Sequence, residues 1–276
     1  MARSRSLRIL ASALASPCAA FHAGTATKLT ASSLHVAAVQ PKMAASINPY
    51  FTAVDQDACT KLIAEFCEAT KTEEGCLYYE WTQAGDKIYV REAYKDGDAL
   101  LAHLGNVGPI LDKLLAGPAK LDRLEIVGSS AEIEKVKPAT EPLGTVYFEA
   151  VESAKPLATK VVSPSCLSIH PYFSVVDQAA CTKLIAEFCE ATKTEEGCLY
   201  YDWAQAGDKL FVREAYKDGD ALLAHLGNVG PILDKLLAGP AKLESLEIVG
   251  AGNELEKVKE ATAPLGTIYY ETVGSI

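Results

Sequence analysis

The sequence predicts an α+β protein in which two copies of one β-α-β-β-α-β unit pack together as a pseudo-dimer within the chain. Three observations predict this. Residues 49–151 recur as residues 171–273 at a constant offset of 122, with about one position in six changed. Each copy alternates strand-like and helix-like patterns in that order. One face of the resulting sheet carries aromatic residues that its own copy cannot cover, so we expect the twin sheet to bury it.

The first half of the unit has clear local signals. The segment PYFTAVD (Pro49–Asp55) is short and rich in aromatic and β-branched residues, which is typical of a strand. In QDACTKLIAEFCEATKTEEG, apolar residues recur at helical spacing until Gly75 ends the pattern. CLYYEWT and KIYVREAY are predicted strands, and Gly85–Asp86 between them suits a tight hairpin.

The stretch REAYKDGDALLAHLGNVGPILDKLLAG occurs twice without a change and predicts the second helix, which Asp96 or Asp98 can cap. Proline lacks a backbone donor and clashes with the preceding turn, so we expect a break near Asn106–Pro109. The rest of the unit is a strand at Leu121–Val127, a short helix near Ala131–Val136 that Ser129 can cap, and a strand at Gly144–Val151. This order is that of a ferredoxin-like fold.

The chain divides into a presequence (1–45), a first domain (46–151), a linker (152–170) and a second domain (171–276). Residues 1–45 contain five basic residues and no acidic one, with a short apolar run at Leu7–Ala15. They resemble the bipartite presequence of algae with complex plastids, in which a phenylalanine such as Phe21 follows the first cleavage site. We therefore expect a plastid location. A mitochondrial transit peptide or secretion is the alternative.

Charge and cysteine usage exclude several classes of protein. The net charge is −10 although residues 1–45 are basic, so the remaining chain is strongly acidic and would repel nucleic acid and anionic membranes. The run at Leu7–Ala15 is too short to span a bilayer. The eight cysteines include no Cys-x-x-Cys pair, and Cys59 and Cys67 fall on one apolar helical stripe. We expect reduced core cysteines and no metal site.

Two motifs of each copy carry a family resemblance. The first consists of Glu73, Gly75, Cys76, Leu77 and Tyr79. The second consists of Glu92, Tyr94, Asp96, Ala99, Leu100 and His103, and it recurs as Glu214, Tyr216, Asp218, Ala221, Leu222 and His225. With these motifs the chain resembles the antibiotic biosynthesis monooxygenase family of the dimeric α/β-barrel superfamily. The resemblance implies two units closing one barrel, each with a pocket between its sheet and helices.

His103 and His225 are the candidate catalytic residues, because a half-buried imidazole can move a proton during oxidation of a phenol or ligate iron. The alternative is a structural histidine that is hydrogen-bonded to Glu92 or to a backbone carbonyl and holds helix to sheet. Asn106 and Asn228 lie about one helical turn further on. In the catalytic scheme they orient the oxygenated intermediate.

The candidate substrate-binding residues lie on two neighbouring strands. Glu92 and its equivalent Glu214 share a strand face with apolar residues, so each carboxylate has either a partner or a raised pKa. Tyr79 and Trp81, with Tyr201 and Trp203, alternate along one strand face and can line a pocket for an aromatic ligand. A structural salt link for Glu92 and core packing for the aromatic pair are the alternatives.

These features predict a cofactor-independent monooxygenase that oxidises a small aromatic or quinol-like compound with O₂. The alternative is a non-catalytic small-ligand-binding or stress-response barrel; an open cavity at His103 favours the enzyme, and a sealed interior favours this alternative. Haem binding is a third interpretation. It is disfavoured because Pro49–Asp55 lacks the asparagine of haem-degrading relatives and Trp81 lies on the second predicted strand rather than the third. The expected partners are a small aromatic or quinone-like molecule and the second half of the chain, with further self-association left open.

Overall fold

A computed structural model describes residues 44–157 and 166–276. The N-terminal half comprises β1 (Ala45–Ala53), α2 (Gln56–Thr70), β2 (Cys76–Ala84), β3 (Lys87–Tyr94), α3 (Gly97–Leu115), β4 (Ala119–Gly128), α4 (Ser130–Thr140), a 3₁₀ turn (Glu141–Leu143) and β5 (Val146–Lys155). The C-terminal half comprises β6 (Leu167–Val175), α5 (Gln178–Thr192), β7 (Cys198–Ala206), β8 (Lys209–Tyr216), α6 (Gly219–Leu237), β9 (Ala241–Gly250), α7 (Gly252–Thr262), a 3₁₀ turn (Ala263–Leu265) and β10 (Ile268–Ser275). The element order is the predicted one.

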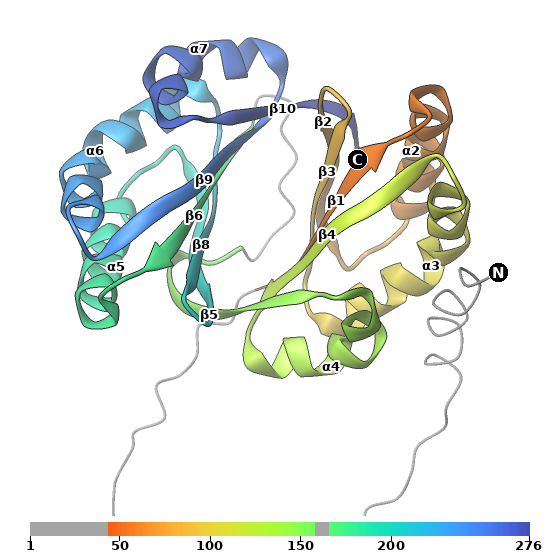
Figure 1. Cartoon of the computed structure of the whole chain (residues 1–276), viewed down its shortest axis with the longest axis horizontal. Helices are drawn as coiled ribbons and strands as arrows, with labels where there is room; N and C mark the ends of the chain where they lie inside the picture. The colour runs from red at the N-terminus through yellow and green to blue at the C-terminus, as the bar shows by residue number, and fades with distance from the viewer. Residues whose placement is uncertain (1–43, 158–165) are drawn as a thin grey trace, which may run out of the picture.

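The strands of both halves form one closed barrel, in the order β1-β3-β2-β10-β9-β6-β8-β7-β5-β4. The last strand of each half crosses to the other half: β5 pairs with β7, and β10 pairs with β2. Figure 1 shows the two sheets facing each other with the helices outside. The predicted fold and the predicted pseudo-dimer within the chain are therefore confirmed.

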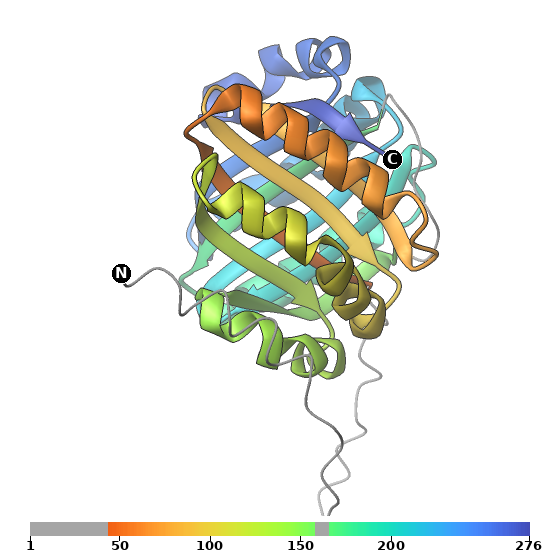
Figure 2. The same ribbon diagram turned by 90° about the vertical axis from the view of Figure 1, so that its right-hand side faces the viewer.

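The helices cover the outer face of the barrel, and Figure 2 shows α2 and α3 lying across the N-terminal strands. Asp55 caps α2 and Asp96 caps α3, each by accepting a hydrogen bond from a backbone amide three residues on. The apolar stripe of α3 is buried against the sheet through Leu100, Leu104, Val107 and Leu114. Among the described residues, no helix is long and apolar enough to cross a membrane.

The inner face of the barrel buries the aromatic residues that a single copy leaves uncovered. Tyr50 and Tyr89 stack with their centroids 4.4 Å apart, and Tyr172 and Phe211 do so at 4.7 Å. The two central tyrosines meet where the halves face each other, with 3.0 Å between the hydroxyls of Tyr50 and Tyr172. The interior also contains buried charges, such as the Arg213–Asp202 ion pair at 2.8 Å. The twin sheet thus covers a mixed aromatic and polar surface.

The predicted break in the second helix is wrong, because α3 runs unbroken from Gly97 to Leu115 with Pro109 inside it. Pro109 lies on the exposed side of the helix. The carbonyl that loses its amide partner belongs to Gly105, which is also exposed and can be hydrated. Burial of Leu104 and Val107 on the opposite side holds the helix on the sheet.

The strands extend further than the sequence indicated. β1 starts at Ala45, where it pairs with Tyr94, and so it begins within the predicted presequence. β5 and β6 occupy both ends of the predicted linker, because Ser153 pairs with Asp202 and Ser168 pairs with Val249. Residues 1–43 and 158–165 lie outside the described residues, so the presequence and the plastid location stay predictions.

Gly75 allows a close approach that places the start of α3 beside the turn before β2. A Cβ atom on Gly75 would lie 2.5 Å from the Cβ of Ala99. We therefore expect Gly75→Ala to lower the free energy of unfolding by about 1–3 kcal/mol. The control is Gly105→Ala, because Gly105 lies in α3 with nothing within 4 Å of the added atom, and it is expected to raise stability slightly. Urea unfolding measures the free energy of unfolding of both variants. Changes of the same sign in the two variants would contradict the prediction.

Candidate functional site

His103 is held between two carboxylates. The ring lies on α3 and is 2% exposed. Its Nδ1 is 2.9 Å from Oε2 of Glu73, and its Nε2 is 3.1 Å from Oε2 of Glu92. Glu73 comes from the turn between α2 and β2, and Glu92 comes from β3. The ring therefore ties helix, turn and strand together, as the structural interpretation of the sequence requires.

The second copy repeats this arrangement. His225 lies 3.0 Å from Glu195 through Nδ1 and 3.2 Å from Glu214 through Nε2. Asn228 donates to Oε1 of Glu195 at 2.7 Å, and Tyr216 donates to Glu214. Both halves thus carry the same five-residue constellation, which we call the carboxylate–histidine relay: Glu73, His103, Glu92, Tyr94 and Asn106, with their equivalents Glu195, His225, Glu214, Tyr216 and Asn228.

The electrostatics around His103 favour a charged ring. Burial alone would lower the pKa of His103, but the charge of Glu92 and the hydrogen bonds to Glu73 and Glu92 raise it to about 9. The ring is therefore protonated at neutral pH. Because the pKa is raised on folding, the resulting stabilisation is complete below about pH 6.5 and is lost as the pH rises through 9. In the C-terminal half, burial raises the pKa of Glu214, and the charge of His225 opposes this.

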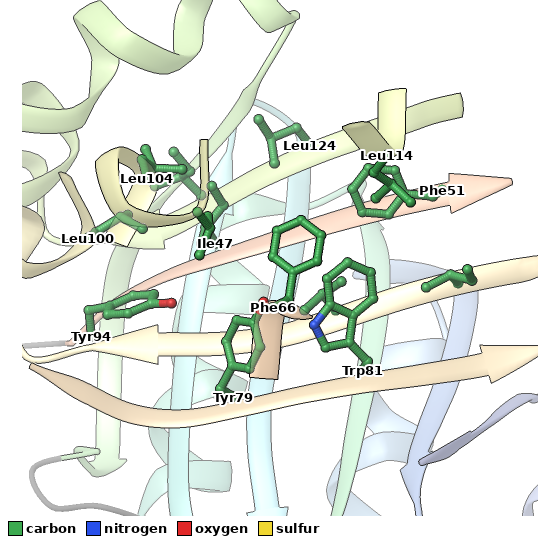
Figure 3. Packing of buried hydrophobic residues seen from close by; sticks show 14 of the residues in the cluster. Ile47, Phe51, Phe66, Tyr79, Trp81, Tyr94, Leu100, Leu104, Leu114 and Leu124 are labelled. Carbon is green, nitrogen blue, oxygen red and sulfur yellow. The ribbon is translucent and has the colours of Figure 1, made fainter. Parts of the chain in front are cut away.

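A cavity of about 150 Å³ lies between the N-terminal sheet and its helices. Tyr79, Trp81, Glu92 and His103 line it together, among mostly apolar side chains. Figure 3 shows Tyr79, Trp81 and Phe66 gathered under Leu104 and Ile47 on the helix side of the strands. The structure therefore brings four of the five candidate residues of this half into one wall.

The equivalent cavity of the C-terminal half is smaller, at about 50 Å³. Tyr201, Trp203, Glu214 and His225 line it in the same way. The residue types that line the two cavities are the same at equivalent positions. The larger cavity also extends to Asp112, Leu115, Ala139 and Thr140, whose equivalents do not line the smaller one.

Each cavity has a tryptophan in its wall whose indole nitrogen is buried. The indole nitrogen Nε1 of Trp81 has no hydrogen-bond partner among the described residues, and neither has that of Trp203. Both side chains are nearly fully buried. Each nitrogen has less than 1 Å² of accessible surface, so a ligand in the cavity would contact the apolar part of the indole and not its N–H group.

Asn106 lies on the outer side of His103 and does not border the cavity. Its amide donates to Oε1 of Glu73 at 2.7 Å and to the carbonyl of Ala69 at 3.0 Å. Together with Glu73, Tyr94 and His103 it lines a surface groove of about 580 Å³, and Asn228 has the equivalent place in the other half. His103 therefore borders both the cavity between the sheet and the helices and the solvent-facing groove.

Glu73 and Tyr94 belong to the two motifs but were not among the predicted site residues. Tyr94 donates to Oε2 of Glu92 at 2.5 Å. Its place on the same strand face as Glu92 was a usable signal, whereas Glu73 lies in a turn without periodicity. Within residues 44–157 and 166–276, no group of three or more His, Cys, Asp or Glu side chains is arranged to hold a metal ion.

Comparison with known proteins identifies relatives of each half. Residues 52–107 and 177–229 match the model of the family described as antibiotic biosynthesis monooxygenase. Each match includes the first long helix, the next two strands and the histidine of the relay. No curated protein matches the chain.

Solved structures match as well. A candidate monooxygenase of Fusobacterium nucleatum has 15% identity and a TM-score of 0.51, with 75% of this chain and 90% of that chain covered. A candidate monooxygenase of Lactobacillus acidophilus has 11% identity and a TM-score of 0.48, with coverages of 75% and 91%. MupZ of Pseudomonas fluorescens has 29% identity and a TM-score of 0.37, with coverages of 39% and 89%. The Fusobacterium structure shows the shared fold.

Proposed function

Because both halves of this chain belong to the antibiotic biosynthesis monooxygenase family, we propose that the protein oxidises a small phenol or quinol with O₂ and without a bound cofactor. The reaction takes place in the N-terminal cavity. The observation that carries this proposal is the cavity itself, which is mostly apolar and has Glu92 and His103 in its wall. An open cavity at His103 supports the enzyme over a barrel that only binds ligands.

The cavity volume sets the size of the ligand. A dry cavity of about 150 Å³ accommodates a single benzene ring, and the N-terminal cavity has this volume. The C-terminal cavity of about 50 Å³ has room for no more than a water-sized molecule or two. We therefore assign the activity to the N-terminal half and a one-ring substrate to its cavity.

The polar groups of the wall set the chemistry of the ligand. The carboxylate of Glu92 can accept a hydrogen bond from a ligand, whereas the indole of Trp81 offers the cavity only apolar surface. A ring with a hydroxyl group facing Glu92 would donate to the carboxylate, and its apolar face would pack against the aromatic side chains of Tyr79 and Trp81. Phenols and hydroquinones have this pattern.

The relay supplies acid–base chemistry. Glu92 takes the proton of the ring hydroxyl, and the resulting phenolate carbon forms a C–O bond with O₂. The peroxide is protonated, the ring carbon loses its hydrogen as a proton, and the O–O bond breaks. One oxygen atom ends as a quinone carbonyl and the other leaves as water, so a phenol and O₂ give a quinone and H₂O. His103 and Glu73 connect Glu92 to the surface groove, through which protons exchange with solvent.

Asn106 acts on this chemistry through Glu73. Its amide group fixes one oxygen of Glu73, and the other oxygen faces the histidine. We therefore assign Asn106 and Asn228 to positioning their carboxylates, in place of the contact with an oxygenated intermediate that the sequence suggested.

Oxygen uptake tests the proposal. Purified protein, dialysed against a chelator and free of added flavin, is mixed with one-ring phenols, hydroquinones and hydroxyaryl ketones, and with a three-ring anthrone for comparison. We expect uptake with at least one one-ring compound, one equivalent of quinone per O₂, and little turnover of anthrone. Binding by calorimetry without oxygen uptake would contradict the enzyme and support the ligand-binding barrel.

A further inference from the structure

The two seams at which the halves join differ in a coordinated way. At one seam β2 pairs with β10, and Thr82 lies directly opposite Thr272. At the other seam β7 pairs with β5, and Ala204 lies directly opposite Ala150. Residues 82 and 204 are equivalent in the two copies, and so are residues 150 and 272. Each seam therefore joins two residues of the same type, although the two seams differ.

The aromatic residues beside these pairs follow the same rule. Tyr89 contacts Tyr270 with 5.6 Å between the ring centroids, and Phe148 contacts Phe211 at the same distance. Positions 89 and 211 are equivalent, as are 148 and 270. All four rings are buried. One seam is therefore built from threonine and tyrosine, and the other from alanine and phenylalanine.

We infer that these four contacts form a pairing code by which the N-terminal half recognises the C-terminal half rather than a second copy of itself. If two N-terminal halves paired, Thr82 would face Ala150 and Tyr89 would face Phe148. If two C-terminal halves paired, the same mismatches would occur in reverse. All four contacts match only in the mixed pair.

The hydrogen bonds of the seams reinforce the code. The hydroxyl of Thr272 donates to Oε1 of Glu80 at 2.6 Å. The equivalent position of the N-terminal half is Ala150, which has no hydroxyl to offer. The shorter Asp202 occupies the place of Glu80 in the other copy, and it accepts a hydrogen bond from Ser153 at 2.7 Å instead. Each carboxylate therefore finds its donor on the last strand of the other half.

The middle of the barrel also distinguishes the pairings. Arg123 lies 3.1 Å from Glu125 of its own half and 3.5 Å from Glu247 of the other half. Its equivalent in the C-terminal half is Ser245. A pair of C-terminal halves would bury two glutamates here without an arginine, which is strongly unfavourable. A single arginine serves both carboxylates only in the mixed pair.

The code matters for the candidate site, because the C-terminal half completes the N-terminal core. The backbone amide of Ile276 donates to the carbonyl of Tyr79 at 3.2 Å, and Gly274 pairs with Trp81. A Cβ atom on Gly274 would lie 2.8 Å from Ile63 of α2. The last residues of the chain thus support the two aromatic residues of the N-terminal cavity wall.

A residue swap in the full chain tests the code. The first variant combines Ala204→Thr, Phe211→Tyr, Tyr270→Phe and Thr272→Ala, which makes all four contacts mismatched. The second variant adds Thr82→Ala, Tyr89→Phe, Phe148→Tyr and Ala150→Thr, which restores matched contacts with the two seams exchanged. The wild type and both variants contain the same set of residues at these eight positions. Differences between them therefore do not come from composition.

We expect the first variant to unfold at a temperature lower by roughly 5–10 °C. The second variant is expected to recover at least half of that loss. The recovery is incomplete because this variant lacks the 3.2 Å contact between Tyr89 and His170 and the hydrogen bond from Thr272 to Glu80. The inference would be overturned if the second variant unfolded at the same temperature as the first variant or at a lower one. It would also be overturned if the first variant unfolded at the same temperature as the wild type. If the first variant does not fold, the same comparison is made with the four threonine and alanine exchanges alone.

Discussion

The substitution Glu92→Gln is expected to lower the rate of oxygen uptake with a one-ring phenol by roughly 10²–10⁴-fold, which is the usual contribution of a general base. Glutamine keeps the shape of the side chain and its place in the cavity wall but cannot take a proton. Oxygen uptake at saturating substrate measures the effect, and circular dichroism checks that the fold is retained.

The duplication supplies a matched control for this variant. Glu214→Gln makes the same chemical change in the other half, where Glu214 also contacts a histidine at 3.2 Å. Because the C-terminal cavity is about 50 Å³ and the N-terminal one about 150 Å³, Glu214→Gln is expected to leave most of the uptake in place. Equal losses from the two variants would show that both cavities work. Unchanged uptake in Glu92→Gln would remove the carboxylate from the mechanism.

The outline of the fold could be predicted because it depends on local periodicity and on one global requirement. A sheet whose inner face carries residues such as Tyr89 and Phe211 must be covered, and the duplication supplies the cover. The crossing of β5 and β10 could not be predicted in the same way. The residues that pair with β5 lie about fifty positions further along the chain, and segment 152–155 has the composition of a linker. Strand pairing over such a distance leaves no local signal.

The candidate site could be predicted in part, for a geometric reason. His103 and Glu92 lie on elements with a clear periodicity, so their common side could be inferred. Asn106 is three residues beyond His103, which is a rotation of about 300° around the helix axis. The remaining offset of about 60° turns its amide towards the outer groove, where it contacts Glu73. Sequence spacing alone places two such residues near each other but does not decide which of them borders the cavity.

Arg123, which contacts two buried glutamates in the middle of the barrel, predicts a large and pH-dependent effect on stability. We expect Arg123→Ser to lower the free energy of unfolding by roughly 1–3 kcal/mol at pH 8. This is less than the loss for a fully buried pair, because the side chain of Arg123 is 38% exposed and its charge is partly screened. At pH 5 the loss is expected to be much smaller. Thermal or urea unfolding at the two pH values measures both.

The pH dependence of this loss in stability follows from the pKa of Glu125. Burial raises this pKa to about 7, although the charge of Arg123 opposes the rise. Between about pH 4.5 and 7 the folded state therefore binds more protons than the unfolded chain, and Glu125 lowers stability as the pH rises through this window. Without Arg123 the pKa of Glu125 rises further, so the pH range in which Glu125 lowers stability extends above 7. At pH 5 the carboxyl group is protonated with or without the arginine, so little is lost there.

The second copy again provides the control. Ser245 occupies the equivalent position, and Ser245→Ala is expected to leave stability unchanged at both pH values. An equal loss at pH 5 and pH 8 in Arg123→Ser would mean that the arginine acts through packing, since its guanidinium carbon lies 3.8 Å from the ring centroid of Tyr50. A loss confined to high pH assigns the effect to the two buried glutamates. In that case Arg123 neutralises two carboxylates, Glu125 from the N-terminal half and Glu247 from the C-terminal half.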